Sequence, residues 1–104
     1  MFDWTPELKK RLTYAVSSQN SFTLGVISTP IFNINQDRLL AIVVNDSANK
    51  VYLSLGARAT AGVGILLTAN GGSFSFGQCS DFPWLGEVCA ISDGAGSNIT
   101  IVEV

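Results

Sequence analysis

The chain of 104 residues contains no histidine and few charged side chains. Lysine, arginine, aspartate and glutamate make up 13% of the sequence, against roughly 25% in an ordinary soluble domain. Apolar residues make up 47%, which is an ordinary share, so the deficit is specific to charge. Because a domain of this size has a high ratio of surface to volume, we expect another protein to cover part of its apolar surface.

The absence of histidine excludes catalysis by an imidazole base, and no Gly-x-Ser-x-Gly motif marks a nucleophilic serine. None of the lysines of a possible Ser–Lys dyad (Lys9, Lys10 and Lys50) lies near a distinctive serine motif. The acidic residues are scattered over predicted turns without an Asp-x-Asp spacing, which indicates solvated turn residues: Asp37, Asp46, Asp81, Glu87 and Asp93. The sequence predicts no catalytic, cofactor-binding or metal site, and an enzyme that acts through these carboxylates is a minor alternative.

The formal net charge is −2, and the only basic cluster is Lys9-Lys10-Arg11. A nucleic-acid partner requires a basic patch, so we expect none. The longest apolar run, Leu39 to Val44, has six residues, whereas a membrane-spanning helix needs about 20. Asp3 and Glu7 interrupt the first residues, so we expect neither a membrane partner nor a secretory signal.

Two cysteines, Cys79 and Cys89, are too few for a disulfide framework or a zinc site. They flank a plausible turn at residues 81–86 and could face each other across a hairpin. A chain without an export signal folds in a reducing compartment. The interpretation that we favour is two reduced, partly buried thiols, and a disulfide stays the alternative.

Residues 1–20 are predicted to form an N-terminal arm. Thr5-Pro6-Glu7 is a good helix start, and apolar residues recur on one face up to Val16, which predicts a short amphipathic helix over residues 5–16. Ser17–Ser21 reads as a polar linker. So short a helix is marginal alone, so the arm must dock on a surface. Its candidate interface residues are Phe2, Trp4, Leu8, Leu12 and Val16.

Residues 21–104 are predicted to form a β body. Short apolar or alternating segments are separated by turns such as Asn70-Gly71-Gly72. Leu39–Val44 is apolar at every position, which is typical of a strand buried on both faces. This spacing predicts an all-β fold, an antiparallel sandwich or small barrel of about seven or eight strands. The predicted strands are residues 22–27, 31–34, 39–44, 51–55, 63–67, 74–76, 87–92 and 99–104.

Trp84 lies in the apolar segment Phe82-Pro83-Trp84-Leu85. Four such residues in a row are not expected to stay in water, so the indole either fills the core or meets a partner. We therefore add Trp84 to the candidate interface. A glycan-binding module would instead need this ring exposed.

The order of segments in residues 36–104 resembles that of small virion proteins of tailed bacteriophages, of the head decoration or cement type and related small tail-associated β-domains. The segments that carry the resemblance are Arg38–Asn45, Asn49–Gly56, Ala61–Leu67, Gly71–Phe74, Trp84–Gly94 and Ile99–Glu103. The resemblance assigns no functional residue. It implies a structural protein that is assembled in the host cytoplasm, carried on the virion and associated with other virion proteins, often as a trimer.

Taken with the absence of a chemical site, this resemblance leads to one functional expectation. The chain is expected to be a capsid decoration or cement protein, a homo-oligomer that bridges and stabilises shell subunits. The alternative is a tail or fibre module that binds a host-surface glycan.

Overall fold

The computed structural model describes residue 7 and residues 16–104. The described part contains eight strands and is all-β, as the sequence predicts. The strands are β1 (Ser18–Leu24), β2 (Thr29–Phe32), β3 (Ala41–Asn45), β4 (Val51–Leu55), β5 (Ile65–Leu67), β6 (Ser73–Phe76), β7 (Val88–Ser92) and β8 (Ser97–Glu103). Among these residues no helix is long and apolar enough to cross a membrane.

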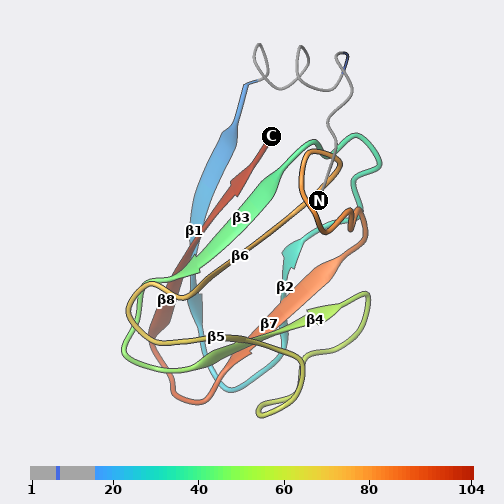
Figure 1. Ribbon diagram of the computed structural model, residues 1–104. Coiled ribbons are helices and arrows are strands. Elements are labelled where there is room, and N and C mark those ends of the chain that lie inside the picture. Colours follow the sequence, from blue (N-terminus) through green and yellow to red (C-terminus); the bar gives the residue numbers. More distant parts are fainter. Residues whose placement is uncertain (1–6, 8–15) are drawn as a thin grey trace.

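The strands form two four-stranded antiparallel sheets that face each other as a sandwich (Figure 1). We call β1-β8-β3-β6 sheet A and β2-β7-β4-β5 sheet B. Four of the pairings, β1–β8, β2–β7, β3–β6 and β4–β5, are those of a single long antiparallel hairpin. Rolling this hairpin up adds the pairs β3–β8 and β4–β7, which gives the connectivity of a jelly roll.

The core lies between the two sheets and follows the period-2 alternation of the strands. Pairing partners share a face, so Val43 and Ile101 of sheet A point inward, as do Leu53 and Ala90 of sheet B. The main cluster of buried side chains comprises Leu24, Ile31, Phe32, Ala41, Val43, Val51, Leu53, Leu67, Phe76, Val88, Ala90, Ile99 and Ile101. At one end the Phe32 and Phe76 rings join the sheets edge to face, with centroids 5.1 Å apart.

Two expectations are corrected by the strands. The polar segment Ser17–Ser21 is not a linker, because from Ser18 onward it is the first half of β1 and is paired with β8. Backbone hydrogen bonds hold this half, and they need no apolar side chain. The run Leu39–Val44 is not buried on both faces, because the outward side chains Ile42 and Val44 of β3 are only half-buried. The rest of the predicted arm, residues 1–6 and 8–15, lies outside the described residues.

Candidate functional site

The eight strands carry one charged side chain, that of Glu103 at the end of β8. The other charged residues between positions 16 and 104 all lie in the connections between strands: Asp37, Arg38, Asp46, Lys50, Arg58, Asp81, Glu87 and Asp93. Shortage of charge in the composition thus becomes a spatial pattern. Between positions 16 and 104 the outward-facing strand positions are uncharged, and every charged residue except Glu103 lies in a connection.

The outward face of sheet A combines an apolar centre with polar, uncharged flanks. Ile42 and Val44 of β3 pair with Val102 and Thr100 of β8, and these four half-buried residues form the centre. Short hydroxyl and amide side chains flank them on β1, β6 and the remainder of β8. The flanking residues are Gln19, Ser21, Thr23, Ser73, Ser75 and Asn98.

The outward face of sheet B is more apolar. Leu66 of β5 pairs with Tyr52 of β4, which pairs with Ile91 of β7. Ala59, in the connection between β4 and β5, is buried against Ile91 and Cys89, with Tyr52 packed beside them. Leu66 remains 45% exposed. Together these side chains form an apolar outward face. The β4–β5 connection covers the part around Ile91, whereas the part around Leu66 stays exposed.

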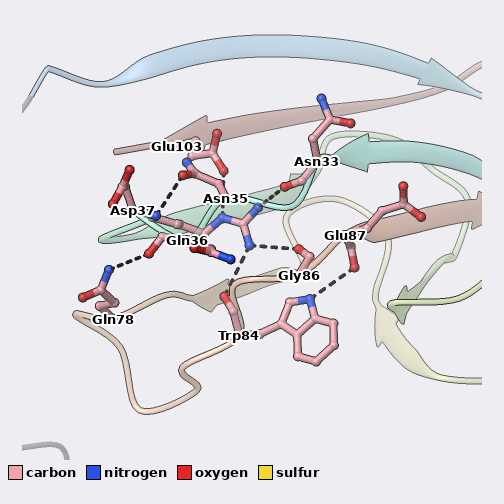
Figure 2. A network of polar contacts seen from close by, with 10 residues as sticks. Asn33, Asn35, Gln36, Asp37, Gln78, Trp84, Gly86, Glu87 and Glu103 are labelled. Atoms are coloured by element: carbon pink, nitrogen blue, oxygen red, sulfur yellow. Dashed lines mark hydrogen bonds and ion pairs between the residues drawn. The ribbon is translucent and has the colours of Figure 1, made fainter.

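The charge of Glu103 is neutralised inside the molecule by Arg38, whose side chain is completely buried. Nε of Arg38 donates to Oε2 of Glu103 at 2.7 Å. The Nη1 group donates to the backbone carbonyls of Trp84 (3.3 Å) and Gly86 (3.1 Å), and the Nη2 group to that of Asn33 (2.7 Å). Figure 2 shows these acceptors converging from three separate segments. Multiple hydrogen bonds and one counter-charge are what a buried guanidinium requires.

Aromatic rings and a tight turn hold the arginine in place. Its guanidinium carbon lies 5.3 Å from the centre of the Phe32 ring and 5.0 Å from that of Phe76, within cation–π range. The turn before it is closed by Asn35, whose side chain accepts the Asp37 N–H and whose carbonyl accepts the Arg38 N–H. Arg38 therefore links the β2–β3 connection, the segment before β7 and the end of β8 at one end of the sandwich.

Trp84 belongs to the same end of the molecule. Its half-buried ring packs against the main core cluster, and its Nε1–H donates to the carbonyl of Glu87 at 3.2 Å. The ring lies so close to Gly56 and Gly86 that a Cβ at Gly86 would fall 2.6 Å from it. Trp84 thus packs into its own fold and keeps an accessible part. It does not form an aromatic shelf with Tyr52, which belongs to the other apolar cluster.

The remaining candidate interface residues belong to the arm. Val16 precedes β1 and is 91% exposed. Phe2, Trp4, Leu8 and Leu12 lie outside the described residues.

The two cysteines are free and buried. They do not face each other across a hairpin, because Cys79 follows β6 of sheet A whereas Cys89 lies in β7 of sheet B. Burial raises the pKa of the Cys89 thiol, and a hydrogen bond to the Glu87 carboxylate and the negative charge of that group act in the same direction. The Cys89 thiol is therefore a poor nucleophile.

No group of three histidine, cysteine, aspartate or glutamate side chains that could hold a metal ion occurs within the described ranges.

Sequence reasoning missed the buried network around Arg38. An arginine after Asp37 in a polar segment resembles any solvated loop residue, and no periodicity marks it. One available signal was its position directly before the longest apolar run. A charged side chain directly before a buried strand must either point to solvent or form hydrogen bonds and an ion pair inside the protein.

Comparison with protein-family models, with curated proteins and with solved structures finds no match to this chain.

Proposed function

We propose that this chain is a structural protein of a tailed-bacteriophage particle, a decoration or cement protein that bridges and stabilises subunits of the shell. The observation that carries the proposal is the uncharged state of both outward sheet faces, where the only charge of the strands is neutralised within the fold. The cores of protein interfaces are depleted in charged residues. Uncharged faces of this kind therefore suit a protein that functions while packed against other proteins.

The exposed apolar side chains support the same proposal. Besides Val16 and Leu66, large hydrophobic residues are exposed in several connections: Val26, Ile27, Ile34, Val63 and Phe82. Single exposed apolar residues are ordinary. Here they occur together with uncharged sheet faces, so much of the surface lacks the charges that keep proteins apart.

The architecture is compatible with the proposal without deciding it. Jelly-roll sandwiches occur in viral capsid proteins and in lectins, and one fold hosts unrelated functions. The resemblance of residues 36–104 to small phage virion proteins favours the first class. The partners would be other virion proteins and further copies of the chain, assembled in the host cytoplasm, and the proposed role requires no cofactor.

The test is binding to heads of the phage whose genome encodes the chain, prepared without this protein. The wild-type protein should bind saturably and raise the temperature at which the heads release DNA. Leu66→Lys, which adds a charge to the outward face of sheet B, should weaken binding by about tenfold or more if it falls in an interface core. Ala48→Lys adds the same charge in the exposed β3–β4 connection and should bind normally.

Two results would contradict the proposal. One is the absence of binding to heads, and the other is equal binding of wild type, Leu66→Lys and a Lys variant of the sheet A face such as Ser73→Lys. The glycan-binding alternative would be favoured by a different pair of results. The protein would not bind heads, and the fluorescence of Trp84 would change saturably when a host-surface oligosaccharide is added.

A further inference from the structure

The jelly roll has four edge strands, and three of them are protected against pairing with another chain. The edge strand β2 of sheet B contains Pro30 and an irregular register beside it. The opposite edge, β5, has only three residues. At the edge of sheet A, β6 is followed by a segment that returns over it, with the Ser80 hydroxyl donating to the carbonyl of Ser75 and the Phe82 ring packed on Phe74. Proline, irregular register, short length and a covering loop are the usual protections of an edge.

Among the residues that the structure describes, the fourth edge strand, β1, has none of these protections. It is seven residues long, regular in register, and free of proline and charge. Within residues 16–104, β8 is its only strand neighbour. From Ser18 to Ser21 its side chains are exposed on both faces.

The register shows which backbone groups of β1 face away from the sheet. In an antiparallel pair, alternate residues direct both N–H and C=O to a given neighbour. Asp46 donates its N–H to the carbonyl of Asn98, so Asn98, Thr100 and Val102 bond to β3. The intervening residues of β8 bond to β1. Their partners in β1 are Ser18, Asn20, Phe22 and Leu24.

It follows that Gln19, Ser21 and Thr23 direct their backbone groups outward. A second observation agrees, because the N–H of Ser21 donates to the Asn20 side chain at 2.8 Å rather than to β8. The open edge therefore presents three residues in the alternation that an added antiparallel strand requires.

We infer that β1 pairs with β1 of a second copy of this chain, antiparallel about a two-fold axis at Ser21, so that two A sheets become one continuous sheet. Ser21 then lies opposite Ser21 of the second copy, and Gln19 lies opposite Thr23 of the second copy. Each of these pairs exchanges two backbone hydrogen bonds. The backbone carbonyl of the second Ser21 replaces the Asn20 side chain as acceptor for the Ser21 N–H.

The absence of charge on β1 is the reason for choosing a second copy as the partner. Across a two-fold axis a strand meets itself reversed, so a charge near the centre meets the same charge. β1 carries only uncharged side chains from end to end. The same register places Asn20 opposite Phe22 of the partner, which covers part of a ring that is half-buried in one copy. This pairing does not depend on the proposed role in a virion, and it makes a dimer rather than the trimer that the resemblance implies.

The test is sedimentation of the full chain over a range of concentrations. The wild type should show a reversible monomer–dimer equilibrium. Ser21→Pro removes only an outward N–H, so β8 keeps its bonds to β1 and the circular dichroism spectrum should be unchanged. Loss of the paired bonds at the axis should raise the dissociation constant of the dimer by about tenfold or more. Ser21→Lys should do the same through repulsion across the axis, and Ser73→Lys on the β6 edge should not.

Cross-linking tests the geometry independently of affinity. Residues in a hydrogen-bonded antiparallel pair have Cα atoms about 5.5 Å apart, which suits a disulfide. Ser21→Cys should therefore give a covalent dimer under mild oxidation, and Ser73→Cys should not, while the native cysteines are buried. The inference is overturned by a wild type that stays monomeric, by a trimer, by a dimer that the Lys and Pro variants at residue 21 leave intact, or by equal cross-linking of the two Cys variants.

Discussion

The guanidinium of Arg38 and the carboxylate of Glu103 meet at 2.7 Å although 65 positions separate them in the sequence. One partner is fully buried, and the side chain of the other is 29% exposed. The contact joins the turn before β3 to the end of β8, beside the carbonyls of Asn33, Trp84 and Gly86.

Arg38→Met should lower the free energy of unfolding by about 3–5 kcal/mol, because it leaves a carboxylate without its partner and three carbonyls without donors. Urea denaturation measures the change. Arg58→Met removes an exposed cation and should change stability by no more than about 0.5 kcal/mol. The double variant Arg38→Met/Glu103→Leu should recover only part of the loss, since the carbonyls remain unpaired. Full recovery would show that the carbonyl bonds contribute nothing.

Asn45→Asp tests a second buried polar residue. Nδ2 of Asn45 donates to the carbonyls of Asn49, Leu67 and Thr68 at 2.7–3.1 Å. An ionised carboxylate has no proton to donate and would face these oxygens, so the fold should lose about 3 kcal/mol or more. Thermal unfolding at neutral pH checks the prediction. Asn70→Asp, in an exposed turn, is the matched control, and an equal loss in both variants would contradict the argument.

Gly77→Ala should be strongly destabilising. Gly77 has φ +126°, and a Cβ there would lie 2.7 Å from the carbonyl oxygen of Leu39. At Gly25 a Cβ would meet nothing within 4 Å, so Gly25→Ala should be neutral or stabilising by up to about 1 kcal/mol. The difference between the two melting temperatures is the measurement. Similar values would mean that the turn after β6 shifts to admit the methyl group.

Stability should fall at alkaline pH through Cys89. Its pKa is raised in the folded state, chiefly by burial, so the unfolded thiol ionises first as pH rises. The contribution of the neutral Cys89 thiol to the free energy of unfolding is complete below the pKa of the unfolded state. It is lost as the pH rises through the pKa of the folded state. Cys89→Ala should flatten this part of the stability–pH curve, measured by urea denaturation between pH 7 and pH 10. Cys79→Ala serves as the comparison, and an unchanged slope in Cys89→Ala would contradict the assignment.

Truncation separates the arm from the sheet. Because β1 begins at Ser18, deletion of residues 1–15 should leave the body folded. Deletion of residues 1–24 removes Leu24, which is buried in the core, and uncovers β8, so it should cost about 2–5 kcal/mol or more. Circular dichroism during thermal unfolding distinguishes the two. If the shorter deletion unfolds the body, the arm is part of the core.

The strands were predictable where side chains alternate or form apolar runs. Tyr52 and its neighbours in β4 show the alternation, and all eight strands were predicted to within a few residues. β1 was placed too late because Ser18–Ser21 carries no apolar signal, and its backbone pairing with β8 depends on residues far away in the sequence. Leu39–Val44 was expected to be buried on both faces, and the partial exposure of Ile42 and Val44 was missed. An apolar run does not reveal whether a second layer covers it.

The candidate site was less predictable than the fold. The shortage of charged residues was visible in the composition, but the absence of charge from the outward strand positions could be found only from the register of every strand. The partners of Arg38 are mostly backbone carbonyls, which every residue carries, so no pattern of side chains could identify them. The expectation for the segment Phe82–Leu85 was met only in part, because Trp84 packs against the core whereas Phe82 and Pro83 are exposed. Whether the accessible part of Trp84 meets a partner stays a prediction.

The place of β8 in sheet A also constrains the biosynthesis of the protein. β8 lies between β1 and β3, so the strand made later than the other seven completes the middle of the sheet. Among the described strands, until residues 97–103 have been synthesised β1 lacks its one pairing partner and β3 lacks one of its two. Pairings this distant in sequence fold slowly, and a nascent chain would expose unpaired strands meanwhile. Folding of the β body is therefore expected to follow the synthesis of β8 rather than to proceed strand by strand.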